Sequence, residues 1–339
     1  MAGFFSSTKF NKIYWGTTPI KNAYLGSTKL WASTSSMYGK VASVNYSVLS
    51  LSSDYFASWT NYNNSENMRC ICFSEDRFFI GAVGKILTFK DGVFSTVFTL
   101  PITTQSVIGI TAYKKNIVAW YSSTTVVSTD GGATWSIHNT GYTGIFYANT
   151  ITHDGTKFVG VHTGGYVVTS VDGKSWTTGM YTGEAWTRGI YYLNGRYYLV
   201  SQGYNRHKYS TDLVTWTMCA TTIGESWTDT SSVAYSSIPM LEYINGTYVC
   251  VHSLAYVYPV GYATDGSNWT IKQQNYPIGG LNWICVNCGD RVLIVSKAFY
   301  ASSGMSVWQT TNGIDYTRVT NGAPSIDPVS NRCVAYANE

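Results

Sequence analysis

Two acidic residues at equivalent places in successive repeats are the first candidates for chemistry in this chain. Glu184 and Glu225 each follow a Gly and precede a Trp by two positions, at Trp186 and Trp227. Two carboxylates on one face of a protein can act as acid and base in glycoside cleavage. Duplication of a repeating unit explains the pair equally well, so catalysis stands as an alternative and not as the leading hypothesis.

Aromatic and polar residues in the predicted loops are candidates for binding. Aromatic rings stack on the C–H surfaces of sugars, while neighbouring polar groups bind the hydroxyls. The same aromatic side chains could instead pack between wedge-shaped sheets, and both readings stay open. The candidates for binding a glycan or a partner are Tyr181, Glu184, Trp186, Tyr204, Arg206, Glu225, Trp227, Tyr256, Tyr276 and Tyr300.

A turn motif of the form Ser-x-Asp-x-Gly-x-Thr-Trp must position these loops. Its best copy runs from Ser128 to Trp135. The Asp accepts backbone N–H bonds, Gly takes the positive-φ position, and the Trp folds back as an apolar plug. The Asp or Asn of each copy falls at 54, 91, 130, 172, 212, 265 and 312. A repeat of about 40 to 50 residues indicates propeller blades.

These copies resemble the Asp-box (bacterial neuraminidase) repeat family over roughly residues 40–339. In that family the box is a structural turn at the rim of each blade, away from any active site. The resemblance therefore implies structural roles for Asp54, Asp130, Trp135, Asp172, Trp176, Asp212, Trp216, Asp265 and Trp269. The family's early Arg-Ile-Pro signature is absent from residues 1–60, so we do not expect a functional sialidase.

The expected architecture is all-β: a seven-bladed Asp-box β-propeller over residues 40–339, preceded by a small N-terminal β-meander. We expect residues 332–337 to pair with the first blade and close the ring, which removes an open sheet edge. The Asp turns and the Asn/Asp-Gly turns both join odd strands to even ones and share one face. The opposite face carries the remaining loops and is the predicted binding face.

Residues 1–34 form a separate predicted unit, followed by a linker at 35–39. Tyr14-Trp15-Gly16 recurs as Tyr24-Leu25-Gly26, and each copy reads as a hairpin. Two hairpins have too small a core to be stable alone, so the unit should dock on something. The stretch resembles short modules of bacteriophage tail and other virion proteins. That resemblance implies attachment to a virion, with Tyr14, Trp15, Tyr24 and Trp31 as the candidate contacts.

Composition excludes several classes of protein. Charged residues make up 12% of the chain and the net charge is +4, which is too small and dispersed to argue for nucleic-acid binding. No apolar run reaches the roughly 18 residues of a membrane-spanning helix. Residues 1–6 lack a basic segment followed by an apolar core, so we expect no secretory signal. Seven cysteines suit a reducing compartment, with buried thiols preferred over a zinc site. We expect no metal and no cofactor.

The leading hypothesis is a bacteriophage virion protein, assembled in the host cytoplasm. It would be a tail-fibre, head-fibre or receptor-binding protein that contacts other virion proteins through residues 1–34 and host-surface polysaccharide through the propeller, and it could be a homo-oligomer. One alternative is a decoration or assembly protein that binds only virion proteins. Others are a glycan hydrolase using Glu184 and Glu225, and a cellular scaffold of the photosystem-assembly type.

Overall fold

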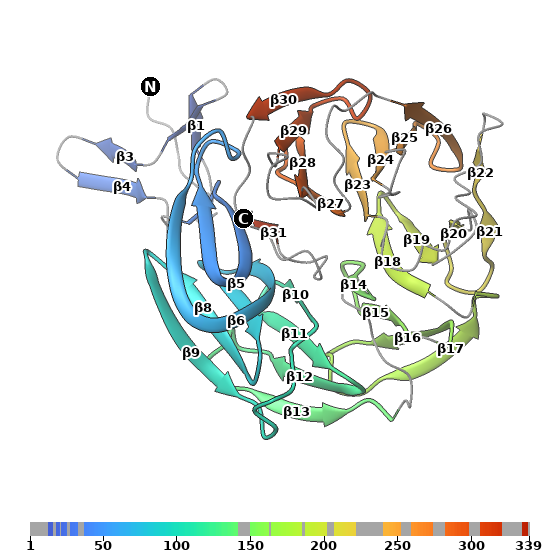
Figure 1. The fold of residues 1–339 in the computed structure, drawn as a ribbon, viewed down its shortest axis with the longest axis horizontal. Helices are drawn as coiled ribbons and strands as arrows, with labels where there is room; N and C mark the ends of the chain where they lie inside the picture. Colours follow the sequence, from blue (N-terminus) through green and yellow to red (C-terminus); the bar gives the residue numbers. More distant parts are fainter. Residues whose placement is uncertain are drawn as a thin grey trace.

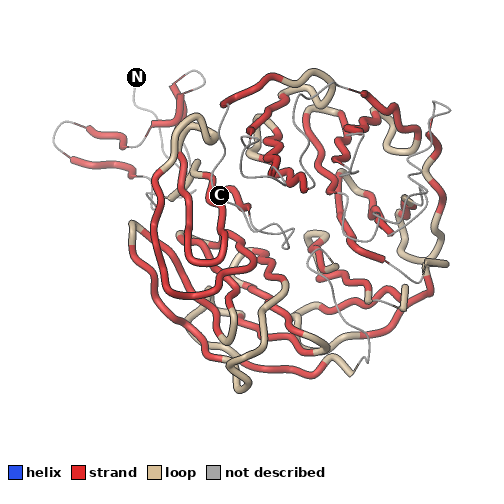
Figure 2. Tube along the Cα trace, in the orientation of Figure 1, coloured by secondary structure: helices blue, strands red, loops and turns tan. Residues whose placement is uncertain are grey.

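Every regular element that the structure describes is a β-strand (Figures 1 and 2). Aromatic residues make up 16% of the chain, and aromatic and β-branched side chains favour the half-buried surface of a pleated sheet. The described residues contain no helix that could span a membrane. The computed structural model describes residues 13–15, 18–20, 22–25, 28–32, 37–141, 150–162, 164–184, 187–201, 207–221, 240–251, 259–273, 282–297, 306–320 and 334–337.

From residue 41 onward, antiparallel sheets follow one another around a ring, which confirms the predicted all-β propeller (Figure 1). The first blade holds β31 (Val334–Tyr336), β5 (Val41–Ser52), β6 (Thr60–Ser74), β7 (Arg77–Ala82), β8 (Lys85–Lys90) and β9 (Val93–Thr99). The second blade holds β10 (Gly109–Tyr113), β11 (Asn116–Tyr121), β12 (Thr124–Ser128) and β13 (Ser136–Asn139). The third holds β14 (Ile151–His153), β15 (Phe158–Val161), β16 (Tyr166–Ser170) and β17 (Thr177–Tyr181).

The remaining three blades repeat this plan. The fourth holds β18 (Thr187–Leu193), β19 (Arg196–Ser201), β20 (Lys208–Ser210) and β21 (Thr217–Met218). The fifth holds β23 (Met240–Ile244), β24 (Thr247–Val251), β25 (Pro259–Ala263) and β26 (Asn268–Gln273), with β22 (Ala220–Thr221) at its edge. The sixth holds β27 (Asn282–Asn287), β28 (Val292–Lys297), β29 (Ser306–Thr310) and β30 (Thr317–Thr320).

The described strands make six blades, so the prediction of seven is wrong. That prediction assigned the Asp54 turn and the Asp91 turn to separate blades. In the structure β6 is one continuous strand whose first half pairs with β5 and whose second half pairs with β7. Both turns therefore lie in the first sheet. A 15-residue strand reads in sequence as two, because strands usually have about 5 or 6 residues.

The C-terminal strand lies between the last blade and the first. β31 pairs antiparallel with the start of β5 and contacts β27. The N–H of Gly39 donates to the carbonyl of Ala337 at 2.9 Å. At the same junction the guanidinium carbon of Arg291 lies 4.0 Å from the ring centre of Tyr55, a cation–π contact. Both ends of the propeller segment thus join the first blade.

The apolar core lies largely between neighbouring blades. Phe79 of β7 packs with Ile117 of β11, and both are fully buried. Tyr198 of β19 packs in the same way with Cys250 of β24. Burying a large apolar side chain contributes about 1.5–3 kcal/mol. Contacts between blades therefore hold the ring together.

Most outer edges of the blades are irregular or covered. The outer strands β9, β17 and β30 each carry a register shift against their neighbour, and β22 covers β26 in parallel. A bulge or a covering strand prevents an edge from pairing with another chain.

Four short strands precede the propeller. β1 (Ile13–Trp15) pairs with β2 (Thr18–Ile20), and β3 (Asn22–Leu25) pairs with β4 (Thr28–Ala32). Within the described residues these two hairpins share no sheet with the propeller.

Candidate functional site: the loop face of the propeller

The two faces of the ring carry different kinds of connection. The turn face holds the turns between the first and second strands of each blade together with the Asp turns between the third and fourth strands. Among the described connections, the loop face holds turns between second and third strands and crossovers to the next blade. In the third blade, the Asp172 turn joins β16 to β17 on the turn face, while residues 162–165 join β15 to β16 on the loop face.

The Asp130 turn shows how the motif works. Ser128 Oγ donates to Asp130 Oδ1 at 2.8 Å and accepts the N–H of Gly132 at 2.8 Å. The backbone N–H of Thr134 donates to Asp130 Oδ1 at 2.9 Å, and its hydroxyl donates to Oδ2 at 2.5 Å. These hydrogen bonds, chiefly the one from the Thr134 hydroxyl, lower the pKa of Asp130 to about 2. Its carboxylate is thus engaged within its own turn.

Five other copies make the same kind of contacts. Asp54 accepts from the N–H of Ser58 at 2.9 Å, Asp172 from Lys174 at 2.9 Å, Asp212 from Thr215 at 2.8 Å, Asp265 from Asn268 at 2.8 Å, and Asn312 from Asp315 at 2.8 Å. The tryptophans fold back, and the indole N–H groups of Trp135 and Trp176 donate to Gly132 and Gly173 at 3.1 and 3.0 Å. Trp216 packs in the cluster between the third and fourth blades, and Trp269 is buried between the fourth and fifth.

Asp turns of successive blades also pack against the preceding blade. A Cβ on Gly132 would lie 2.4 Å from the ring of Phe79, and one on Gly173 would lie 2.4 Å from Val118 Cγ2. At the corresponding place in the fourth blade stands Leu213, with φ 65°. Its buried side chain packs against Val159 of the third blade. The turns therefore fasten successive blades together.

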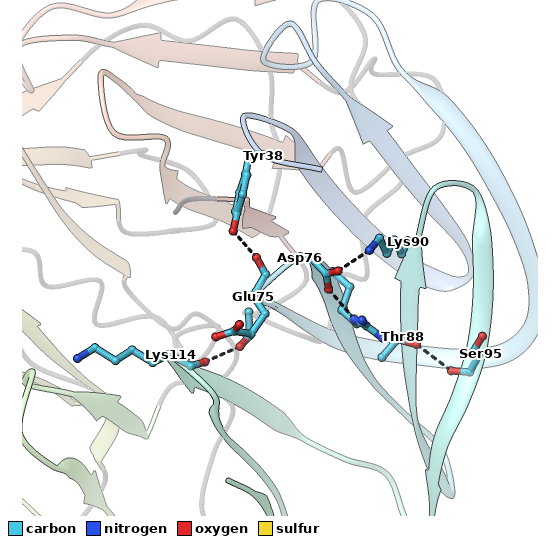
Figure 3. A network of polar contacts seen from close by, with 9 residues as sticks. Tyr38, Glu75, Asp76, Thr88, Lys90, Ser95 and Lys114 are labelled. Atoms are coloured by element: carbon cyan, nitrogen blue, oxygen red, sulfur yellow. Dashed lines mark hydrogen bonds and ion pairs between the residues drawn. The ribbon is translucent and has the colours of Figure 1, made fainter. Parts of the chain in front are cut away.

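Figure 3 shows another polar network on the turn face, at the β6–β7 hairpin. Asp76 accepts from Arg77 Nε at 2.7 Å and from Lys90 Nζ. Ser74 Oγ donates to the carbonyl of Lys114 in the second blade at 2.5 Å. The Asp76 contacts lie within the first blade, and the Ser74 contact joins it to the second.

On the loop face, the third blade carries an exposed aromatic group. Tyr166 and Tyr181 are cross-strand partners of β16 and β17. Their ring centres lie 5.2 Å apart at an interplanar angle of 45°, and the residues are 43% and 47% exposed. The ring of His162 stacks on Tyr166, with centres 5.6 Å apart. We call Tyr166 and Tyr181 the tyrosine pair.

Glu184, a sequence candidate, lies beside this pair but is buried. Its Oε1 is 3.2 Å from Nζ of Lys208 in the fourth blade, and the two side chains are 9% and 13% exposed. Lys208 Nζ also donates to the carbonyl of Thr182 at 2.9 Å. The carboxylate is therefore part of an ion pair between blades, which does not suit a catalytic acid or base that must reach a substrate.

The residue that follows Tyr181 is hydrogen-bonded to the neighbouring turn. The backbone N–H and the hydroxyl of Thr182 both donate to the carbonyl of Gly165 at 2.9 Å. A Cβ on Gly165 would lie 2.0 Å from the carbonyl oxygen of Glu184 and 2.9 Å from the Tyr181 ring. Only a glycine allows this close approach.

The other sequence candidates cannot be placed side by side with this group. Trp186, Tyr204, Arg206, Glu225, Trp227, Tyr256, Tyr276 and Tyr300 lie outside the described residues. Tyr14 and Trp15 fall on β1, Tyr24 on β3 and Trp31 on β4. Sequence reasoning missed Tyr166, His162 and Lys208. Tyr166 directly follows Gly164-Gly165, and a Tyr after a glycine turn on the loop face was a usable signal.

Thiols and carboxylates do not gather into a metal centre anywhere in the described part of the chain. Cys285 and Cys288 are free and buried, and burial raises the pKa of both thiols. This environment favours inert, protonated thiols.

Comparison with known proteins supports the fold. No protein-family model matches the chain and no curated protein matches it. Among solved structures, YCF48 bound to a D1 peptide is similar, with a TM-score of 0.57, 14% identity, and coverage of 78% of this chain and 88% of that one. Virginiamycin B lyase from Staphylococcus aureus gives 0.57 and 12%, covering 74% and 83% of the two chains. The designed protein Ika8 gives 0.54 and 11%, covering 85% of each. Identities this low establish the propeller fold alone.

Proposed function

We propose that this chain is a non-catalytic binding protein of a bacteriophage virion, whose propeller presents its loop face to polysaccharide on the host surface. The observation that carries the proposal is the exposed tyrosine pair. Two tyrosines that each keep over two fifths of their surface in contact with water are not needed for packing between blades. Exposed aromatic rings are the side chains that stack on sugars.

The N-terminal hairpins supply the second half of the proposal. Each is a two-stranded sheet, and an isolated hairpin is marginally stable in water. A partner surface would therefore stabilise them, and their sequence resembles short virion modules. We accordingly assign particle attachment to residues 1–34 and host contact to the propeller.

The alternative of a decoration or assembly protein draws on a different observation. All five residues of the outer strand β17 are exposed, with Met180 at 54%, and such an uncharged strip also suits a protein surface. The YCF48 propeller is seen with a D1 peptide, but at 14% identity that partner does not transfer. We rank this alternative second.

A glycan hydrolase is less favoured. Glu184 is held by Lys208, and Glu225 lies outside the described residues. The streptogramin B lyases among the similar structures, at 12% and 11% identity, bear on the fold alone. Turnover of host polysaccharide that disappears in Glu184→Gln/Glu225→Gln would revive this reading.

The deciding experiment compares the full chain with a chain lacking residues 1–34. Both are applied to host bacteria and to virus particles assembled without this protein. We expect both chains to bind bacteria and only the full chain to bind particles. If both chains bind particles and neither binds bacteria, the proposal is wrong and the decoration-protein alternative is favoured.

A further inference from the structure

The tyrosine pair has the geometry of a stacking site for a small ring. Tyr166 and Tyr181 face each other across two strands, with ring centres 5.2 Å apart and planes at 45°. Because the rings are tilted and not stacked flat, they do not cover each other's faces, which agrees with their exposure of 43% and 47%. The C–H face of a sugar ring can lie against such a surface and displace its water.

The polar groups beside the pair neutralise one another. Glu184 and Lys208, the carboxylate and ammonium next to this loop, form an ion pair at 3.2 Å and are largely buried. His162, stacked on Tyr166, accepts the N–H of Gly164 on Nδ1 at 3.0 Å. A ring nitrogen that accepts a hydrogen bond carries no proton, so this imidazole is neutral. Burial also lowers the pKa of His162.

The pair is held in place before any ligand arrives. Lys208 Nζ from the fourth blade donates a hydrogen bond to the carbonyl of Thr182. The hydroxyl of Thr182 in turn donates to the carbonyl of Gly165, which lies between His162 and Tyr166 in the sequence. Hydrogen bonds thus join the ends of β16 and β17, which carry the two tyrosines, to each other and to the fourth blade. A preorganised surface loses little conformational entropy on binding.

From these observations we propose that Tyr166 and Tyr181 bind an uncharged hexose unit of a polysaccharide by stacking, with the Glu184–Lys208 ion pair positioning the loop beneath them. This assignment rests on the proposed host-glycan function and gives it a site and a class of sugar. Sugars bearing carboxylates would gain no ion pair here, because Lys208 is already paired.

The test uses the full chain on an array of neutral hexose oligosaccharides and uronic-acid oligosaccharides. The variants are Tyr166→Ala and Tyr181→Ala, with Tyr166→Phe and Tyr181→Phe to retain the rings. Met180→Ala, which changes a slightly more exposed residue on the same strand as Tyr181, is the matched control. Thermal unfolding of each variant establishes that it is folded.

We expect binding to neutral oligosaccharides, a loss of about tenfold for each Ala variant, and near-normal binding for the Phe variants and the control. Preference for the uronic-acid set, or glycan binding that the Ala variants leave unchanged, overturns this site while leaving host-glycan binding intact. If the wild-type chain binds neither an oligosaccharide nor bacterial cells, both the site and the proposed function are overturned.

Discussion

The turn face and the loop face of this propeller are formed by opposite ends of the same strands, yet their polar groups are used differently. On the turn face, Asp130 and its counterparts bind the N–H groups of their own turns, and the glycines of these turns abut the preceding blade. On the loop face of the third blade, the carboxylate of Glu184 pairs with a lysine of another blade and leaves two tyrosine rings exposed.

The difference shows which face of the propeller can carry a ligand-binding site whose residues do not also stabilise the fold. Changes on the turn face disturb contacts that join blades, whereas the tyrosine pair is exposed beside such a contact. Four experiments examine this division, beginning with the one expected to have the largest effect.

Lys208→Met should lower the free energy of unfolding by about 3–5 kcal/mol, because it leaves the buried carboxylate of Glu184 without its cation. Denaturant unfolding measures the loss. Glu184→Gln/Lys208→Met removes both charges and should lose much less. Equal losses in the single and double variants would mean that the ion pair is not what holds the third and fourth blades together here.

Gly132→Ala should cost about 3 kcal/mol, since the added methyl meets the buried Phe79 ring and the residue has a positive φ. Gly246→Ala is the matched control, with φ 88° against 87° for Gly132 and no atom within 4 Å of the new Cβ. We expect it to cost only about 1 kcal/mol. Similar denaturation midpoints for the two variants would contradict a close contact between the Gly132 turn and Phe79.

Asp154 should make the free energy of unfolding depend on pH. Burial alone would raise its pKa, but hydrogen bonds from Tyr197, Thr156 and Lys157 lower it from 3.8 to about 2. A carboxyl whose folded pKa is depressed stabilises the fold above its unfolded pKa, and this contribution disappears as pH falls from about 5 towards 2. Asp154→Asn should therefore flatten the pH dependence of unfolding in that window. Tyr197→Phe, which removes the 2.6 Å hydrogen bond to Asp154, should flatten it in part; an unchanged slope in both variants would contradict the assignment.

Tyr181→Ala and Tyr166→Ala should have the smallest effect on stability, below about 1 kcal/mol. Their side chains are half exposed. Calorimetric unfolding measures this, alongside the glycan binding that the same variants should weaken. A large drop in unfolding temperature would place the tyrosines among the contacts that hold the blades together.

The propeller could be predicted from the sequence, but the number of blades could not. The repeated turns predicted the blades because Ser, Asp and Gly at that spacing form hydrogen bonds with one another inside the turn. Counting them failed at β6, since nothing in residues 60–74 reveals whether the hydrogen bonding continues or breaks there. The exposure of Tyr181 and the burial of Glu184 could not be predicted either, because Tyr181 ends β17 and Glu184 follows it by only three residues.

The sequence by itself determined the features that depend on near neighbours: all-β elements, the repeating turns, and which connections share a face. Each follows from side chains within a few residues of the backbone they bind. Tertiary structure alone decided that two Asp turns share the first blade, that Lys208 neutralises Glu184 from the next blade, and that Tyr166 stands beside Tyr181. Those outcomes depend on pairing between distant strands, and strand register and packing between blades are set only when the whole ring assembles.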